Sequence, residues 1–249
     1  MRTIILVLAL LASSSWAKGS KPIDDPSDLT ARSWLVADAD NLILSGKDTM
    51  SIRPMASITK VMTVLTVIEA KLNLDEAIAY NKSLLMTRRE LVDIAMVRSD
   101  NHAAELLCKT YPGGYDKCIA DMNANAVKWG MLSTSYVDAT GLLPGNTSTA
   151  EDLLKLLNIA ETNQLIVNSA KKTTVEIRNK KRWLIFKQTN PLVGHQHEFV
   201  VSKTGTTNAA GGCIILTVKT ERGLRRVVVL GSKNGRTRIP EAEFVFKSR

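Results

Sequence analysis

The stretch Ala-Ser-Ile-Thr-Lys-Val-Met-Thr-Val-Leu-Thr-Val-Ile-Glu-Ala, residues 56–70, decides how the rest of the chain is interpreted. Its apolar residues recur at helical spacing, which predicts a helix. Ser57 falls on the first turn and Lys60 lies three positions later, so both side chains project from one face. A serine hydroxyl becomes a strong nucleophile only when a neighbouring group takes its proton. Lys60 is the natural base if burial or nearby cations lower its pKa enough to populate the neutral amine.

Two further strings follow in order: Ser99-Asp100-Asn101 after the end of a helix, and Lys203-Thr204-Gly205 after an apolar strand. Alone, a Ser-x-x-Lys string is usually an ordinary helix start with a solvated lysine, and a Ser-Asp-Asn string is usually a helix cap. Together and in this order, the three strings are typical of serine acyl-transfer enzymes that act on D-alanyl peptides or β-lactams. Lys203 is then the expected second cation near Lys60.

The second string supplies polar groups beside the nucleophile. Ser99 is expected to relay a proton between Lys60 and the leaving nitrogen of the substrate. Asn101 is expected to bind the substrate backbone or to hold Lys60. Asp100 is expected to face away and cap the next helix. His102 is expected to pack on a helix, and the chain offers no credible Ser-His-Asp triad.

The third string predicts where the substrate docks. An exposed sheet edge can accept the substrate as an extra strand, and Gly205 removes a side chain where the ligand backbone comes close. Lys203 and the hydroxyls of Thr204 and Thr206 are expected to bind the terminal carboxylate of the substrate. The backbone N–H groups of Ser57 and Thr206 are expected to form the oxyanion hole.

The remaining polar candidates give weaker signals. His195-Gln196-His197 has no cysteine or carboxylate partner set, so it favours a polar loop over a metal site, and no cofactor is expected. Cys108 and Cys118 flank a Tyr-Pro-Gly-Gly-Tyr turn. They either pair across a helical hairpin or stay separate thiols, because spacing alone does not fix the directions of their Cβ atoms. Cys213 lies in an apolar run and is expected to be a small buried hydrophobe.

The N-terminus has the features of a signal peptide over residues 1–17, with a short apolar run and a small-x-small cleavage site ending at Ala17. The run is too short to span a bilayer, and an uncleaved anchor is the alternative. Residues 18–28 are polar and contain proline, so a flexible linker is expected there, followed by a single catalytic domain over 29–249. A periplasmic or secreted protein with no stable transmembrane anchor after cleavage is predicted.

The charge and composition of the chain limit the classes of molecule that it is expected to bind. Lys and Arg number 33 against 24 Asp and Glu, giving a net charge of +9. The basic residues are scattered without interleaved aromatics, which argues against a nucleic-acid partner. In an exported protein, the same charge attracts anionic wall polymers.

The chain is predicted to be α/β, because strand-like runs occur near both ends and helical patterns lie between them. The expected strands are 33–37, 42–45, 173–177, 199–202, 213–218 and 226–230, with a turn at Glu221-Arg222-Gly223. The expected helix signals are a Thr-x-x-Glu capping box at 87–90, a helical pair around Cys108 and Cys118, a stop at Gly130, a hydroxyl cap at 148–149, and a terminal helix over 239–246. These elements give one mixed sheet plus a helical lobe.

The chain resembles the low-molecular-mass penicillin-binding proteins, which are D-alanyl-D-alanine carboxypeptidases and endopeptidases, and most closely the endopeptidase branch of the penicillin-binding protein 7 type. The resemblance covers about residues 30–235 and is carried by the stretches 55–60, 110–115, 140–142, 148–153, 189–192 and 203–211. It implies a β-lactamase/transpeptidase-like fold, a mostly antiparallel sheet flanked by helices plus a helical lobe. It also implies cleavage of D,D-peptide bonds in peptidoglycan stem peptides through an acyl-enzyme that β-lactam antibiotics trap covalently.

Two departures from the family pattern affect the expected activity. Ser57 and Ser99 are only 42 positions apart (99 minus 57), and the segment 81–86 lacks a loop that normally borders the cleft. The chain also ends soon after the last expected strand, which favours a soluble periplasmic endopeptidase over a carboxypeptidase.

Three alternatives stay open. The first is a D-alanyl-D-alanine carboxypeptidase. The second is a class A-like β-lactamase, although its Glu-x-x-Leu-Asn string fails at Lys155 and Glu151 has the position of a helix cap residue. The third is a non-catalytic module that binds penicillin or the cell wall, which the intact set of polar motif residues disfavours.

Overall fold

The computed structural model describes residues 23–180, 182–195 and 197–248. The expected signal peptide over 1–17, and residues 18–22 of the expected linker, lie outside these residues. Within the rest of that linker, Pro26–Asp28 form a one-turn 3-10 helix (η2) capped by the Asp25 side chain. No helix in the described part of the chain is both long enough and apolar enough to cross a membrane.

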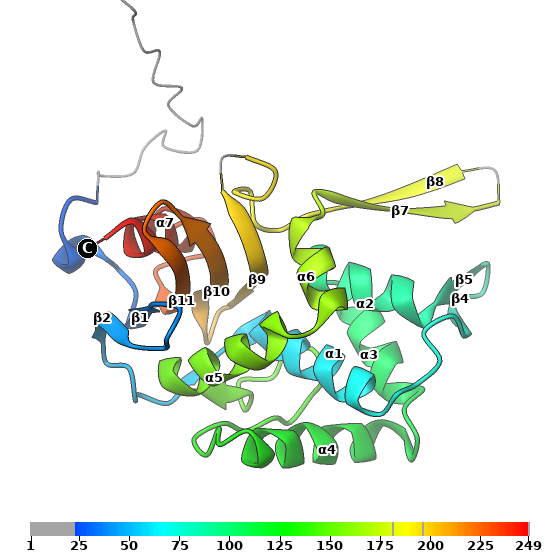
Figure 1. The fold of residues 1–249 in the computed structure, drawn as a ribbon. Coiled ribbons are helices and arrows are strands. Elements are labelled where there is room, and N and C mark those ends of the chain that lie inside the picture. The colour runs from blue at the N-terminus through cyan, green and yellow to red at the C-terminus, as the bar shows by residue number, and fades with distance from the viewer. Residues whose placement is uncertain (1–22, 181, 196, 249) are drawn as a thin grey trace, which may run out of the picture.

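A five-stranded antiparallel sheet forms one side of the molecule (Figure 1). Its strands, in spatial order, are β2 (Ile43–Lys47), β1 (Ser33–Ala37), β11 (Gly223–Ser232), β10 (Gly211–Thr220) and β9 (Glu198–Thr207). Strand β9 therefore lies at a free edge, as expected for the strand that carries the third string. The turn between β10 and β11 is also where the sequence predicts it.

Both faces of the sheet are covered, because successive side chains of a strand point to opposite faces. On β11, Val227 and Val229 pack in one apolar cluster with helix α7 (Arg238–Lys247). Val228 and Leu230 pack in the other cluster, with the remaining helices. The central strands are consequently apolar on both sides, which explains why they read as continuous hydrophobic runs.

The second lobe consists of helices and short hairpins. Its helices are α1 (Thr59–Glu69), α2 (Arg88–Val97), α3 (Asn101–Lys109), α4 (Gly114–Lys128), α5 (Ala150–Glu161) and α6 (Gln164–Lys171). Its strand pairs are β3 (Arg53–Pro54) with β6 (Thr147–Ser148), β4 (Ala77–Asn81) with β5 (Leu84–Thr87), and β7 (Thr174–Asn179) with β8 (Arg182–Lys187). The predicted fold, a mostly antiparallel sheet flanked by helices with a helical lobe, is confirmed, but the expectation of one mixed sheet is wrong because all pairings in the five-stranded sheet are antiparallel.

The predicted helix signals act as expected. The Thr87 hydroxyl accepts from the Glu90 N–H, and the Glu90 carboxylate accepts from the Thr87 N–H, so the capping box begins α2. The Thr149 hydroxyl caps α5 by accepting from the Asp152 N–H, without the reciprocal bond. The helix predicted from Ala56 differs at its start, where Ala56–Ile58 form a 3-10 turn (η3) before α1 begins.

Candidate active site

Ser57 lies in the turn η3, between the sheet and the start of α1. The preceding residue, Ala56, has φ = +49°, a left-handed conformation that costs free energy for any residue except glycine. This turn leaves Ser57 half-buried while Lys60, one turn later, is fully buried. The Nζ atom of Lys60 lies 2.9 Å from the Oγ atom of Ser57. The structure therefore brings together the two residues that the first string predicts as nucleophile and base.

Two carbonyl oxygens complete the surroundings of the Lys60 amine. Nζ donates to Oδ1 of Asn101 and to the backbone oxygen of Thr140, each at 2.7 Å. A carbonyl oxygen can only accept, so these contacts take two N–H bonds. A neutral amine then has its lone pair left for the third neighbour, the Ser57 hydroxyl. The geometry is that of a base aimed at a nucleophile.

Burial lowers the pKa of Lys60 to about 7, whereas the carboxylates of Asp138 and Asp100 act to raise it. Burial removes water from around the ammonium and so favours the neutral form. The sequence pointed to either burial or a second cation, and burial is the leading cause. The expected influence of one lysine on the other acts on Lys203 instead of Lys60. Burial, and then the charges of Lys60 and Arg238, hold the pKa of Lys203 well below its usual value.

Ser99 lies between α2 and α3, with φ = +61°. Its hydroxyl accepts from Nζ of Lys203 at 2.8 Å, and the same Nζ donates to the backbone oxygen of Thr204 at 2.8 Å. Among the described contacts Ser99 is bound to Lys203 and not to Lys60. This hydrogen bond joins the helical lobe to the edge strand β9, next to the turn that carries Ser57.

Asp100 and Asn101, which follow Ser99, have the two different contacts that the sequence predicts. The Asp100 carboxylate accepts from the Ala103 N–H and caps α3, while Asn101 turns to Lys60. His102 was expected to pack on a helix, and this expectation is wrong because it contacts strand β4. Its ring nitrogen lies 2.7 Å from the backbone oxygen of Tyr80, and its ring meets the Tyr80 ring edge-on, so it packs on strand β4.

The threonines of the third string differ from each other. The Thr204 side chain is buried, and its hydroxyl donates to the hydroxyl of Thr189 at 2.7 Å. In this structure the Thr204 hydroxyl contacts the protein, and its expected contact with a substrate carboxylate stays a prediction. Thr206 is exposed, and its hydroxyl donates to the backbone oxygen of Gly205.

Arg238, at the start of α7, completes this part of the site and was not expected. Its guanidinium donates to the hydroxyl of Thr206 and to the backbone oxygen of Gly205, the latter at 2.6 Å. Burial lowers the pKa of Arg238, and among the described residues it has no carboxylate partner within ion-pair distance. The sequence gives no local signal for it, because Arg238 lies outside all three strings and reaches Thr206 only through the path of α7.

Two glycines are needed where other segments pass close to the Ser57 turn. A Cβ on Gly205 would lie 2.8 Å from the Ser57 nitrogen and 3.0 Å from the Met55 oxygen. A Cβ on Gly141, which has φ = +83°, would lie 1.9 Å from the Ala56 oxygen. The close neighbour of Gly205 is thus the chain itself and not only a ligand. Its approach places Gly205 and Thr206 beside the Ser57 N–H.

The loop that supplies the Thr140 oxygen is held by a buried carboxylate. Asp138 accepts from the backbone N–H groups of Thr140, Gly141 and Leu143 and from the Thr140 hydroxyl. These bonds lower the pKa of Asp138 against the opposing effect of burial, which is the largest single influence on it. Asp138 therefore stays ionised and fixes the carbonyl that orients Lys60.

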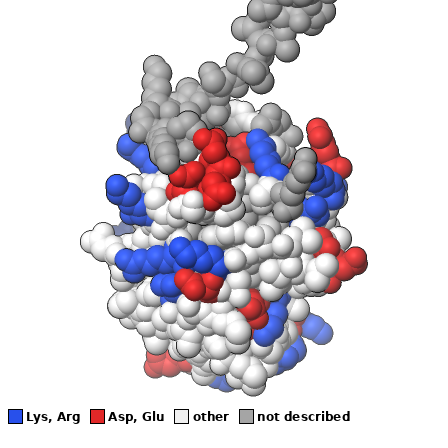
Figure 2. All heavy atoms as spheres, turned by 90° about the vertical axis from the view of Figure 1, so that its left-hand side faces the viewer, with Lys and Arg blue, Asp and Glu red and all other residues white. Residues whose placement is uncertain are grey.

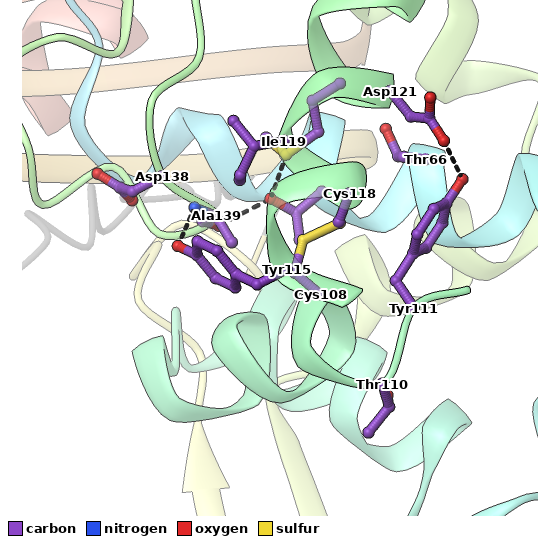
Figure 3. Close-up of a disulfide and its surroundings, with 12 residues drawn as sticks. Thr66, Cys108, Thr110, Tyr111, Tyr115, Cys118, Ile119, Asp121, Asp138 and Ala139 are labelled. Atoms are coloured by element: carbon purple, nitrogen blue, oxygen red, sulfur yellow. Dashed lines mark hydrogen bonds between the residues drawn. A yellow bond between two sulfur atoms is a disulfide. The ribbon is translucent and has the colours of Figure 1, made fainter. Parts of the chain in front are cut away.

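Cys108 and Cys118 form a disulfide between α3 and α4 (Figure 3). On the same helix as Cys118, the Tyr115 hydroxyl accepts from the Ala139 N–H at 3.1 Å. The disulfide thus connects the helix that carries Asn101 with the helix that supports the Asp138 loop. Cys213 is buried as expected.

Glu151 and the histidines do not join the site. Glu151 accepts from the Thr49 hydroxyl at 2.6 Å on the first turn of α5, the helix-start position that the sequence suggested. His197 packs against Phe199 and Phe246, away from the motif residues. Within the described ranges there is no group of three or more potential metal ligands.

Comparison with known proteins gives the family. The family model described as D-alanyl-D-alanine carboxypeptidase matches residues 76–234. A D-alanyl-D-alanine endopeptidase of Pseudomonas aeruginosa is 32% identical, over 95% of this chain and 82% of the relative. The chain belongs to the D-alanyl-D-alanine carboxypeptidase family. A D-alanyl-D-alanine endopeptidase of Escherichia coli is 34% identical over 76% of this chain and 67% of its own length. Membership in this family makes the chain a serine peptidase.

Solved structures agree with the family. A penicillin-binding protein of Listeria monocytogenes, solved with cefotaxime bound, superimposes with a TM-score of 0.80 at 25% identity, over 91% of this chain and 98% of that protein. A Streptomyces DD-transpeptidase mutant gives a TM-score of 0.83 at 23% identity over the same shares, which supports the fold.

Proposed function

We propose that this chain is a D-alanyl-D-alanine endopeptidase that cuts peptide cross-links of peptidoglycan through an acyl-enzyme on Ser57. The observation that carries this proposal is the 2.9 Å contact between Ser57 Oγ and an amine whose two other polar neighbours are carbonyl oxygens. That arrangement suits transfer of the hydroxyl proton to Lys60. The two endopeptidase relatives, which match most of the chain, support this substrate class.

The proposed reaction begins when the Ser57 proton passes to Nζ of Lys60 and Oγ bonds to the substrate carbonyl carbon. The negative oxygen formed in this step is bound by the N–H groups of Ser57 and Thr206. The carbon–nitrogen bond then breaks, and the proton held by Lys60 passes through the Ser99 hydroxyl to the leaving nitrogen, which returns Lys60 to its neutral form. In the second half, Lys60 takes a proton from water, the hydroxide attacks the ester carbonyl, and Ser57 Oγ leaves and recovers its proton.

Binding of the substrate uses the edge of the sheet. The acyl part adds to the free edge of β9 as an extra strand. The carboxylate beside the scissile bond lies near the exposed Thr206 hydroxyl, with the Lys203 amine and the Arg238 guanidinium behind it. A β-lactam enters by the same route and acylates Ser57, in keeping with the drug-bound Listeria structure that this chain resembles.

Labelling by a fluorescent penicillin tests the nucleophile and the base. Ser57→Ala is expected to abolish covalent labelling, because no other group occupies the position of the attacking oxygen. Lys60→Ala is expected to slow labelling by roughly 10² to 10⁴-fold, the usual contribution of a general base. Circular dichroism of both variants controls for folding. Labelling of Ser57→Ala at the wild-type rate would refute the assignment.

The choice between endopeptidase and carboxypeptidase rests on the shape of the cleft border. Only Lys82 and Ser83 join β4 to β5, the hairpin beside the second string, so this side of the site carries no long loop and we expect a second stem peptide to fit there. The family description favours the carboxypeptidase as the second candidate. Mass analysis of products from cross-linked dimers and from monomeric pentapeptides separates the two: release of monomers supports the endopeptidase, and loss of a terminal D-alanine alone supports the carboxypeptidase.

The proposal includes the location of the enzyme. Residues 1–17 act as a signal peptide, and the mature chain works in the periplasm or outside the cell, where its substrate lies. The positive charge is spread rather than gathered on the face shown in Figure 2, where Lys and Arg alternate with Asp and Glu. Cleavage near Ala17 predicts a mature N-terminus at Lys18, which N-terminal sequencing of the exported protein checks.

A further inference from the structure

The β7–β8 hairpin stands out from the body of the molecule above α2 (Figure 1). Its inner face is fixed, because Val175 and Ile177 are buried in the main apolar cluster and Leu184 and Phe186 pack partly against it. The hairpin, called the arm below, is therefore anchored to the main apolar cluster along one face. Its outer face has no such cover.

The outer face carries two large apolar side chains. Trp183 is 59% exposed and Ile185 is 58% exposed. They are two positions apart on one strand, so they point the same way. Register pairs Trp183 with Arg178 and Ile185 with Glu176, so the arginine and the tryptophan stand opposite each other on the same face of the hairpin. An exposed aromatic side chain flanked by arginine is typical of a binding surface.

The same arm carries positive charge without partners. Arg178, Lys180, Arg182 and Lys187 are exposed, and none forms an ion pair with a described residue. At the base of the arm the lysines are paired instead, Lys172 with Asp93 and Lys171 with Glu198. The hairpin carries one carboxylate, Glu176, so its positive charges outnumber its negative charge. Register places Arg178 and Lys187 on the outer face with Glu176, whereas Arg182 points to the face of Leu184 and Lys180 lies in the turn, so the arm as a whole attracts anionic groups.

The arm is attached at the rim of the candidate active site. Directly after β8, the Thr189 N–H donates to the Val97 oxygen, two residues before Ser99. The Thr189 hydroxyl accepts from Thr204, the middle residue of the third string. A long polymer bound in the cleft thus passes within reach of the hairpin.

We propose that the outer face of the β7–β8 hairpin, defined by Arg178, Trp183, Ile185 and Lys187, docks the peptidoglycan strand that is being cut. This rests on the proposed function. Sugar rings of the glycan lie against the Trp183 ring, and the cations bind free carboxylates of neighbouring stem peptides. Continuity with the cleft and opposite charge favour this polymer over a lipid surface, for which the exposed apolar pair is also suited.

Sedimentation with insoluble peptidoglycan tests the docking face, with Ser57→Ala in every protein to prevent digestion. Trp183→Ala is expected to weaken binding about fivefold, the loss of one aromatic contact. Arg178→Glu is expected to weaken it by a similar factor and to reduce its dependence on salt. Leu132→Ala, which removes an even more exposed apolar side chain beyond α4, and Lys47→Glu on the far edge strand are the matched controls.

The substitutions at Trp183 and Arg178 are also placed in the chain with Ser57 intact. Penicillin labelling should then keep its wild-type rate, since the hairpin lies outside the catalytic machinery, while release of soluble fragments from insoluble wall should fall. Unchanged binding to peptidoglycan would overturn the proposal, as would a parallel loss of penicillin labelling. Trp183-dependent binding to anionic phospholipid vesicles, with wall binding unaffected, would assign the arm to a membrane instead. Absence of labelling in the wild-type chain would refute the proposed function and not the docking face.

Discussion

At the scale of single residues, the decisive feature is the setting of one buried amine. Lys60 is surrounded by oxygen atoms, two of which can only accept, and burial brings its pKa to about 7. A solvated lysine would stay charged and could take no proton from Ser57. The reactivity of the serine thus depends on the environment of its neighbour.

The pH dependence of acylation follows from this setting. Below pH 7 Lys60 is protonated and lacks a lone pair, so the rate of penicillin labelling should fall; above pH 7 it should level off. Asp138→Asn removes a negative charge that raises the pKa of Lys60, so the rising limb should move to lower pH. The plateau should also drop, because an amide oxygen replaces only part of the loop's hydrogen bonds.

Labelling rates measured between pH 5 and pH 9 check this prediction, about two units on either side of the midpoint. Asp75→Asn is the matched control, since Asp75 is exposed and pairs with Arg89 away from the site. A limb that stays in place in Asp138→Asn, or moves to higher pH, would contradict the proposed influence of this carboxylate.

The sequence predicted which residues meet but not all that each contacts. Ser57, Lys60, Ser99, Asn101 and Lys203 come together because three short strings with fixed local geometry encode them. Arg238 was missed, since its position depends on where α7 crosses the sheet. Thr204 was assigned to the substrate although its hydroxyl bonds to another strand-flanking residue, a contact that no local pattern specifies.

At the scale of elements, caps and periodicity were sufficient for the long strands and for every helix except α6, which was not predicted. Thr87 and Thr149 cap helices because their side chains satisfy N–H groups that the helix leaves unpaired. The short pairs β4–β5 and β7–β8 were not recognised as hairpins, although part of β7 was expected. Their strands are short and half-exposed, so propensity was weak and only packing against the helical lobe fixes them.

The α3–α4 pair gives a prediction at this scale. Changing both Cys108 and Cys118 to alanine frees a short loop in the unfolded chain and should lower the free energy of unfolding by about 2–3 kcal/mol. Chemical denaturation measures the change. Penicillin labelling at 20 °C should persist, because the Tyr115–Ala139 hydrogen bond and the buried helix contacts do not involve sulfur. Cys213→Ala serves as the control, and an equal loss there would indicate general damage to the core.

At the scale of the whole molecule, function requires that two lobes keep their spacing. The nucleophile and base belong to the helical lobe, whereas the docking strand belongs to the sheet. Lys203 and Ser99 connect them in the cleft. Away from the cleft, Arg226 of β11 pairs with Glu161 at the end of α5, and Glu161 also accepts from Thr217 of β10. Both charges are largely buried, so neither can be solvated if its partner is lost.

The ion pair between Arg226 and Glu161 gives a prediction about the stability of the fold. Glu161→Ala leaves the Arg226 guanidinium buried without its counter-charge and should cost about 3–5 kcal/mol of unfolding free energy. Glu161→Gln should cost less, since the amide oxygen still accepts from Arg226. Glu105→Ala breaks an exposed pair with Lys109 and should change stability by about 1 kcal/mol or less. Because the cleft groups are untouched, the folded fraction of Glu161→Ala should label with penicillin at the wild-type rate. A small loss of stability, comparable to that of Glu105→Ala, would show that packing between the lobes, and not this ion pair, holds them in place.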